Sequence, residues 1–199
     1  MPFTQLGLSA SLLEAIAKSG YTSPYPIQSI AIPAILAGKD ILGIAQTGSG
    51  KTASFVLPIL QYFQSKPVGK NRQIKALILA PTRELAVQTG TVFAEFSKHL
   101  PRPVKSLSVF GGVSINPQMI QLQGVEILVA TPGRLLDLVA NKAMQLSELE
   151  ILVLDEADKM LNLGFKEEMN RIFELLPAKR QNLLFSATLG KDINTITEM

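Results

Sequence analysis

Short apolar runs alternate with longer amphipathic stretches along the chain. Most of the short runs are apolar at successive positions rather than at alternate ones. Such runs suit strands that are buried on both faces, as in a parallel sheet covered by helices. The strand candidates are Ile41–Ala45, Ala76–Ala80, Lys105–Phe110, Glu126–Ala130, Ile151–Leu154 and Asn182–Phe185.

The amphipathic stretches between these runs are typical of helices. They are Thr52–Gln64, Arg83–Lys98, Pro132–Ala140 and Lys166–Leu176. Strand–helix–strand alternation predicts an α/β fold with right-handed crossovers. We therefore expect a mostly parallel sheet with helices on both faces.

The region before the first strand predicts two further helices. Ser11 and Glu14 fit a capping box at the start of the first helix. Gly20 can close that helix in the left-handed conformation. The segment Pro24–Pro26 breaks the chain before a second helix, which we expect to begin near Ile27.

Composition narrows the possible chemistry. The chain has 199 residues, which fits one domain, and 47% of them are hydrophobic, which is enough for a full core. The chain has no cysteine, so disulfides, cysteine-ligated zinc and thiol nucleophiles are excluded. The single histidine, His99, excludes a two-histidine metal site; we interpret it as a cation near a helix C-terminus.

Net charge and hydropathy indicate which partners and which environment to expect for the protein. The net charge of +3 permits nucleic-acid binding but does not argue for it. The basic stretch Lys66–Arg72 contains Pro and Gly, which favours a solvated surface loop over an RNA site. No apolar stretch resembles a signal peptide or a spanning helix, so we expect a soluble, cytoplasmic protein without membrane contact. Asp192–Met199 resembles the middle of a helix, which suggests a longer protein.

The segment Ala45–Thr52 follows a strand candidate and opens a helix, as a phosphate-binding loop does. Gly48 and Gly50 let the backbone approach phosphate oxygens, and the helix N-terminus completes an anion cradle. Lys51 can reach the β- and γ-phosphates, and Thr52 can offer its hydroxyl to Mg²⁺. The expected nucleotide contacts in this loop are Gln46, Thr47, Gly48, Ser49, Gly50, Lys51 and Thr52.

Two carboxylates follow the apolar run Ile151–Leu154. Ligand sites of parallel sheets lie at the carboxyl ends of the strands, so Asp155 should lie beside the phosphate loop if the two strands are neighbours. Asp155 can hold Mg²⁺, and Glu156 can orient or deprotonate the attacking water. The alternative is an ordinary acidic strand end, but the phosphate loop favours the catalytic interpretation. Lys51, Asp155 and Glu156 are thus the candidate catalytic residues.

Asp155–Asp158 spells the signature of the DEAD-box helicase family. Six further segments, including the phosphate loop, match motifs of this family in the family's usual order. Gly20–Gln28 resembles the Q motif, with Phe3 as its upstream aromatic residue. Pro81–Ala86 and Thr131–Arg134 resemble motifs Ia and Ib, Gly111–Gly112 the glycine pair, and Ser186–Thr188 motif III. The chain therefore resembles the N-terminal RecA-like domain of a bacterial-type ATP-dependent RNA helicase, with residues 1–37 as the Q-motif region. One departure is Tyr25, where the Q motif usually has Thr.

The resemblance implies adenine recognition. The amide of Gln28 can both donate and accept, so it can pair with the N6 and N7 edge of adenine. Phe3 should stack on the base, and Tyr21 should belong to the same site. The alternative for Phe3 is a structural one, packing against the N-terminal helix.

The resemblance also implies contacts with the RNA backbone from loops that follow strands. Such contacts are sequence-tolerant and sensitive to salt. Thr82 could instead be only a helix cap, and Arg134 could form an ion pair inside the fold. The expected RNA contacts are Pro81, Thr82, Arg83, Gly111, Gly112, Thr131, Pro132, Gly133 and Arg134.

Motif III implies coupling between hydrolysis and unwinding, with the hydroxyls of Ser186 and Thr188 bonded to Asp158 or Glu156. Active family members have a second RecA-like domain, which we expect to lie outside this chain. The chain alone should bind ATP or ADP with Mg²⁺ as a monomer and hydrolyse ATP poorly. The alternatives are a phosphate-loop kinase, a DNA-dependent helicase, and a nucleotide-switched scaffold without enzymatic activity.

Overall fold

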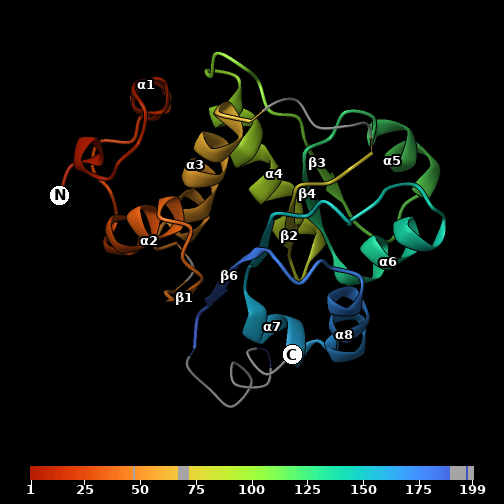
Figure 1. Ribbon diagram of the computed structural model, residues 1–199. Coiled ribbons are helices and arrows are strands. Elements are labelled where there is room, and N and C mark those ends of the chain that lie inside the picture. The colour runs from red at the N-terminus through yellow and green to blue at the C-terminus, as the bar shows by residue number, and fades with distance from the viewer. Residues whose placement is uncertain (47, 67–71, 189–195, 197–199) are drawn as a thin grey trace.

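The chain is described here by a computed structural model, which covers residues 1–46, 48–66, 72–188 and 196. Its strands form one sheet of six, with all neighbours parallel, in the order β1-β6-β5-β2-β4-β3 (Figure 1). The predicted parallel sheet is confirmed, with strand ends that differ slightly from those expected. The strands are β1 (Ile41–Ile44), β2 (Ala76–Leu79), β3 (Ser106–Val109), β4 (Ile127–Ala130), β5 (Ile151–Leu154) and β6 (Gln181–Ser186).

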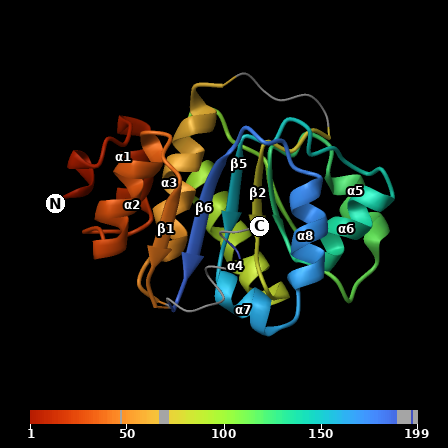
Figure 2. The same cartoon turned by 60° about the horizontal axis from the view of Figure 1, so that its bottom comes forward.

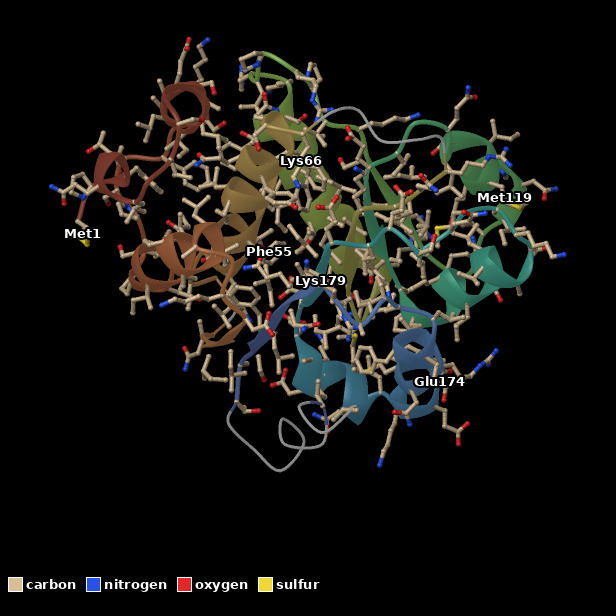
Figure 3. The ribbon with its side chains drawn as sticks, viewed as in Figure 1. Met1, Phe55, Lys66, Met119, Glu174 and Lys179 are labelled. Atoms are coloured by element: carbon tan, nitrogen blue, oxygen red, sulfur yellow. The ribbon has the colours of Figure 1, made fainter. Side chains whose placement is uncertain are left out.

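Helices cover both faces of the sheet, as expected. Figure 2 shows α3 and α4 on one side of the strands and α8 on the other. The helical elements are η1 (Phe3–Gln5), α1 (Ala10–Lys18), α2 (Pro26–Leu36), α3 (Lys51–Gln64), α4 (Arg83–Ser97), α5 (Ile115–Gln121), α6 (Pro132–Ala140), α7 (Ala157–Asn162) and α8 (Lys166–Glu174). Among the described residues, no helix is long and apolar enough to cross a bilayer.

Strands β2, β4, β5 and β6 each contribute to two hydrophobic cores. In β2, Ala76 and Ile78 pack with α3 and α4, whereas Leu77 and Leu79 pack with the helices of the opposite face. All four residues are fully buried. Because successive side chains point to opposite faces, a strand with a core on each side must be apolar at every position.

The N-terminal helices pack outside α3, and their caps differ from expectation in one respect. Helix α1 begins at Ala10, and the cap is Ser9, whose Oγ accepts from the N–H of Leu12. The capping box predicted for Ser11 and Glu14 is therefore wrong, because Ser11 already lies inside the first turn. Gly20 closes the helix in the left-handed conformation with φ 78°, as predicted.

Two predictions concern the ends of other segments. His99 follows the end of α4, where its N–H donates to the carbonyl of Phe96, as expected for a residue at a helix C-terminus. The interior of the basic stretch 66–72, and all of 189–199 except Ile196, lie outside the described residues. The surface loop and the interrupted terminal helix therefore stay predictions.

Candidate nucleotide site and RNA-facing edge

A cleft of about 870 Å³ opens at the carboxyl ends of β1 and β5. Its walls come from the Q-motif region, the phosphate loop, α4 and the acidic residues after β5. The two strands are not neighbours, because β6 lies between them. That condition of the prediction is wrong, yet residues that follow both strands line one cleft. The loop after β1 is joined to the end of β6, because the N–H of Ala45 donates to the carbonyl of Ser186 over 3.0 Å.

Two buried charges of opposite sign face this cleft. Lys51 is 6% exposed and Asp155 is 2% exposed. Lys51 Nζ and Asp155 Oδ1 have no hydrogen-bond partner among the described residues. Because an unsatisfied buried charge is costly, both groups suit a ligand that supplies the missing partners: phosphate oxygens for Lys51 and Mg²⁺ for Asp155.

Burial raises the pKa of Asp155 from its ordinary 3.8 to about 6. The positive charge of Lys51 lowers this pKa, and the negative charge of Glu156 raises it, but removal from water is the largest effect. A perturbed carboxylate at the end of a strand in a cleft is characteristic of functional sites. A nearby divalent cation would favour the charged form of Asp155.

Glu156 has backbone angles that are uncommon for a residue with a side chain. It caps α7 with φ 52° and ψ 51°, in the left-handed region. Its side chain lines the same cleft as Lys51, and its Oε2 lies 3.4 Å from Lys159 Nζ. Such strain is concentrated at functional sites, and here it turns the Glu156 carboxylate into the cleft beside Asp155.

The phosphate loop has the backbone that anion binding requires. Gly48 and Gly50 have φ of 82° and 84°, a conformation that disfavours any residue with a Cβ. Ser49 donates from its hydroxyl to the carbonyl of Gln46 over 2.6 Å, which closes the turn. Thr52 lies in the first turn of α3 and lines the cleft. Thr47 lies outside the described residues.

The amide of Gln28 is not open to a base in this structure. The side chain is fully buried, Oε1 accepts from the N–H of Tyr25 over 2.9 Å, and Nε2 donates to the carbonyl of Gly50 over 3.0 Å. Both polar ends of the amide have backbone partners in this structure, so its pairing with adenine stays a prediction. Gln28 instead connects the turn before α2 to the phosphate loop.

Phe3 also lies away from the cleft. It belongs to η1, is 6% exposed and packs in the core cluster with Leu6 and Leu12. The structure supports the alternative for Phe3, packing against the N-terminal helix, because the core already covers its ring. Tyr21 does line the cleft, with its ring 5.4 Å from that of Phe96. Burial raises the pKa of the Tyr21 hydroxyl.

The other half of the carboxyl edge carries the loops after β2, β4 and β3. Thr82 caps α4 by accepting from the N–H of Leu85 over 3.2 Å, so the alternative of a helix cap is present, and its RNA contact stays a prediction. Arg83 is exposed, and its guanidinium lies 4.6 Å from the centre of the Phe110 ring. The ring positions this charge at the surface, where it can contact phosphate.

Arg134 has an internal role rather than the direct phosphate contact that we expected. It is 6% exposed, Nη2 donates to the carbonyl of Val113 over 2.7 Å, and Nε lies 3.6 Å from Asp137 Oδ2. It thus supports the loop that holds Gly111 and Gly112, both of which are exposed. The remaining candidates differ in access: Pro81 and Pro132 are buried, whereas Thr131 and Gly133 are half-buried.

Comparison with known proteins shows the family. Residues 25–196 match the family described as DEAD/DEAH box helicase. The chain is 50% identical to the ATP-dependent RNA helicase DeaD of Escherichia coli over 196 residues, 98% of this chain and 30% of DeaD. It is 48% identical to the DEAD-box ATP-dependent RNA helicase CshA of Streptococcus pneumoniae over 197 residues, which are 98% of this chain and 36% of CshA.

The chain belongs to the DEAD/DEAH box helicase family. Its fold agrees: a crystal structure of a DEAD box protein from the hyperthermophile Methanococcus jannaschii superposes with a TM-score of 0.90 at 37% identity. That superposition covers 100% of this chain and 53% of the other. The chain thus spans about a third of the length of DeaD and CshA.

In this DEAD-box domain, motif III contacts the acidic motif directly. Thr188 Oγ1 donates to Asp158 Oδ2 over 3.0 Å, and Ser186 Oγ donates to the carbonyl of Thr188 over 2.9 Å. Burial alone would raise the pKa of Asp158, but hydrogen bonds, led by that of Thr188, lower it below the ordinary value. The predicted bond between motif III and Asp158 is present.

Several residues of the DEAD-box cleft escaped the sequence analysis. Leu85, Gln88 and Val92 line it from one face of α4, and Tyr25 lines it from the Q motif. The spacing of three and four residues places the α4 group on one helix face. Only the packing of α4 beside the Q-motif region shows which face that is.

Proposed function

We propose that this chain is the ATP-binding half of an ATP-dependent RNA helicase. It binds ATP or ADP with Mg²⁺, contacts the RNA backbone, and remodels RNA duplexes when joined to a second RecA-like domain. The observation that carries the proposal is the pair of buried, unsatisfied charges, Lys51 and Asp155, at the end of a phosphate loop. The names of DeaD and CshA, which describe ATP-dependent RNA helicases, support it.

Each residue of the cleft has a distinct part in this function. Lys51 and the N–H groups at the start of α3 bind the phosphate chain. Thr52 and Asp155 would hold Mg²⁺, which supplies positive charge to the phosphate oxygens when bound. Glu156 orients the attacking water and accepts its proton.

RNA contacts are assigned to the other half of the same edge. Arg83, held over Phe110, and the exposed Gly111 and Gly112 present a cation and N–H groups without reading base edges. Binding should therefore be sequence-tolerant and weaken with salt. The second domain, a monomeric state and a cytoplasmic location belong to the proposal.

Nucleotide titration tests the proposal. We expect ADP·Mg²⁺ to bind more tightly than GDP·Mg²⁺ in calorimetry, because an amide matches the N6 and N7 edge of adenine and not that of guanine. This requires Gln28 to turn from its backbone partners toward the base. Gln28→Ala should remove the preference, and Lys51→Ala should abolish binding of both nucleotides.

The outcomes separate the alternatives. Equal affinity for ADP and GDP in the unmodified chain would contradict adenine recognition and leave a general phosphate-loop nucleotidase. Binding that survives in Lys51→Ala would place the nucleotide elsewhere. A kinase would also need a lid and a phosphate-acceptor site, and the described residues offer neither.

A further inference from the structure

The ring of Tyr25 lies against the last glycine of the phosphate loop. Gly50 precedes α3 with φ 84° and ψ 15°. A methyl group added at Gly50 would lie 2.7 Å from Tyr25 Cδ2 and 2.6 Å from Gln28 Nε2, closer than real side chains approach. The ring and the amide together therefore cover the Cα of Gly50.

Hydrogen bonds hold Gly50 from the same side. Its carbonyl accepts from Gln28 Nε2 over 3.0 Å and from Ser54 Oγ over 3.2 Å. Gln28 Oε1 in turn accepts from the N–H of Tyr25 over 2.9 Å. The start of α2 thus contacts Gly50 at its carbonyl through Gln28, and the preceding Tyr25 covers its Cα.

Tyr25 is not a core residue. Its side chain is 49% exposed and lines the nucleotide cleft. It occupies the Q-motif position where the family usually has Thr, a side chain without a ring. The ring approaches Gly50 through its Cδ2 and Cγ atoms, which would lie 2.7 Å and 3.1 Å from a methyl group at Gly50.

We propose that Tyr25 is a positioning residue of the nucleotide site, whose ring keeps Gly50 in its left-handed conformation. Glycine has more conformational freedom than any other residue. A ring that covers Gly50 removes other backbone conformations before phosphate binds, so binding loses less conformational entropy. The N–H groups of Lys51 and Thr52 are then aimed at phosphate before the ligand arrives. The proposal rests on the nucleotide binding proposed above, and its effect on affinity should not depend on the base.

The first test needs no nucleotide. In Tyr25→Thr, which restores the usual family residue, the ¹⁵N order parameters of Gly50 and Lys51 should fall on the ps–ns timescale. Tyr25→Phe should keep them, because the ring remains. Ile30→Thr, a change at a 74% exposed position of α2, is the matched control and should leave them unchanged. Unchanged order parameters in Tyr25→Thr would overturn the proposal even if nucleotide binds.

The second test compares ligands with and without a base: ADP, GDP and tripolyphosphate, each with Mg²⁺. Tyr25→Thr should weaken all three by the same factor, on the order of 2–5-fold, while Tyr25→Phe and Ile30→Thr do not. Weakening of ADP alone would show that the ring contacts the base, and no weakening would show that it does nothing for binding; either result overturns the proposal. If the unmodified chain bound none of the three, the proposed function would fail, and the order parameters would still decide whether Tyr25 holds Gly50.

Discussion

At the scale of single residues, the cleft concentrates groups that the fold alone does not satisfy. Lys51 Nζ and Asp155 Oδ1 are buried and have no hydrogen-bond partner in the described part of the chain, and Glu156 adopts a left-handed backbone. Each feature costs stability, since burial of unpaired charge and backbone strain are both unfavourable. A ligand that supplies phosphate and Mg²⁺ would offset the first of these costs.

Asp155→Asn should make the chain more stable at neutral pH in chelator without nucleotide. The pKa of Asp155 is about 6 in the folded state against an ordinary 3.8, so the folded state binds the proton more tightly. Stability therefore falls as pH rises from about 4 to 6 and stays reduced above that. Asparagine removes this penalty, so the free energy of unfolding at neutral pH should rise by up to about 3 kcal/mol.

Urea unfolding of both proteins at pH 4 and pH 7.5 measures this difference. The increase in the free energy of unfolding caused by Asp155→Asn should be present at pH 7.5. It should be absent at pH 4, where Asp155 is protonated in the folded chain. The attraction of Lys51 is already included in the raised pKa. A mutant that is less stable than the unmodified chain at pH 7.5 would show that this attraction exceeds the cost of burial.

At the scale of elements, the N-terminal segment is where sequence and structure differ most. The sequence places Phe3 by its resemblance to an upstream aromatic, but η1 buries the ring among Leu6 and Leu12. Likewise, the cap of α1 is Ser9, two residues earlier than the Ser11 of the predicted capping box. Short elements of this kind are decided by what they pack against, because their local preferences are weak.

Substitutions at Phe3 separate packing from base stacking. Phe3→Ala should destabilise the chain by about 3–5 kcal/mol, because it leaves a cavity in the core. Phe3→Leu keeps an apolar side chain of similar size and should cost less than about 1.5 kcal/mol. ADP affinity of the folded Phe3→Leu chain, measured by calorimetry, should equal that of the unmodified chain. A marked loss of ADP affinity in this stable variant would restore the stacking role.

At the scale of the whole molecule, the carboxyl edge of the sheet has two halves. The proposed nucleotide cleft lies at the ends of β1 and β5, and the loops proposed to contact RNA follow β2, β4 and β3. Strand β6 ends in motif III between the ends of β1 and β5, and Thr188 bonds to Asp158 there. Motif III therefore contacts the acidic motif from outside the cleft lining, as a coupling element would.

Replacing both Ser186 and Thr188 by alanine in the complete protein should separate the two activities. ATP hydrolysis should persist, because neither hydroxyl lines the nucleotide cleft. Duplex separation should be lost, because the bond to Asp158 and the turn that Ser186 closes are both removed. Paired measurements of ATPase and unwinding rates test this, and loss of both activities together would contradict a coupling role.

The sequence by itself determined the fold class and the order of elements, and it predicts the chemistry of the phosphate loop and the acidic motif. Continuous apolar runs such as Ile151–Leu154 require two covered faces, and Gly50 with Lys51 requires a loop at a helix start, so these features follow from local physical rules. The structure confirms the fold class and the order of elements with only small shifts at the element ends.

The tertiary structure decided which segments, distant in the sequence, lie next to one another. Strand order is set by packing between distant segments, so no local pattern shows that β6 separates β1 from β5. The same packing buries Phe3 and Arg134, engages the amide of Gln28 with Gly50, and lays the ring of Tyr25 on the phosphate loop. These contacts join residues far apart in the chain, and only the folded core brings them within reach of each other.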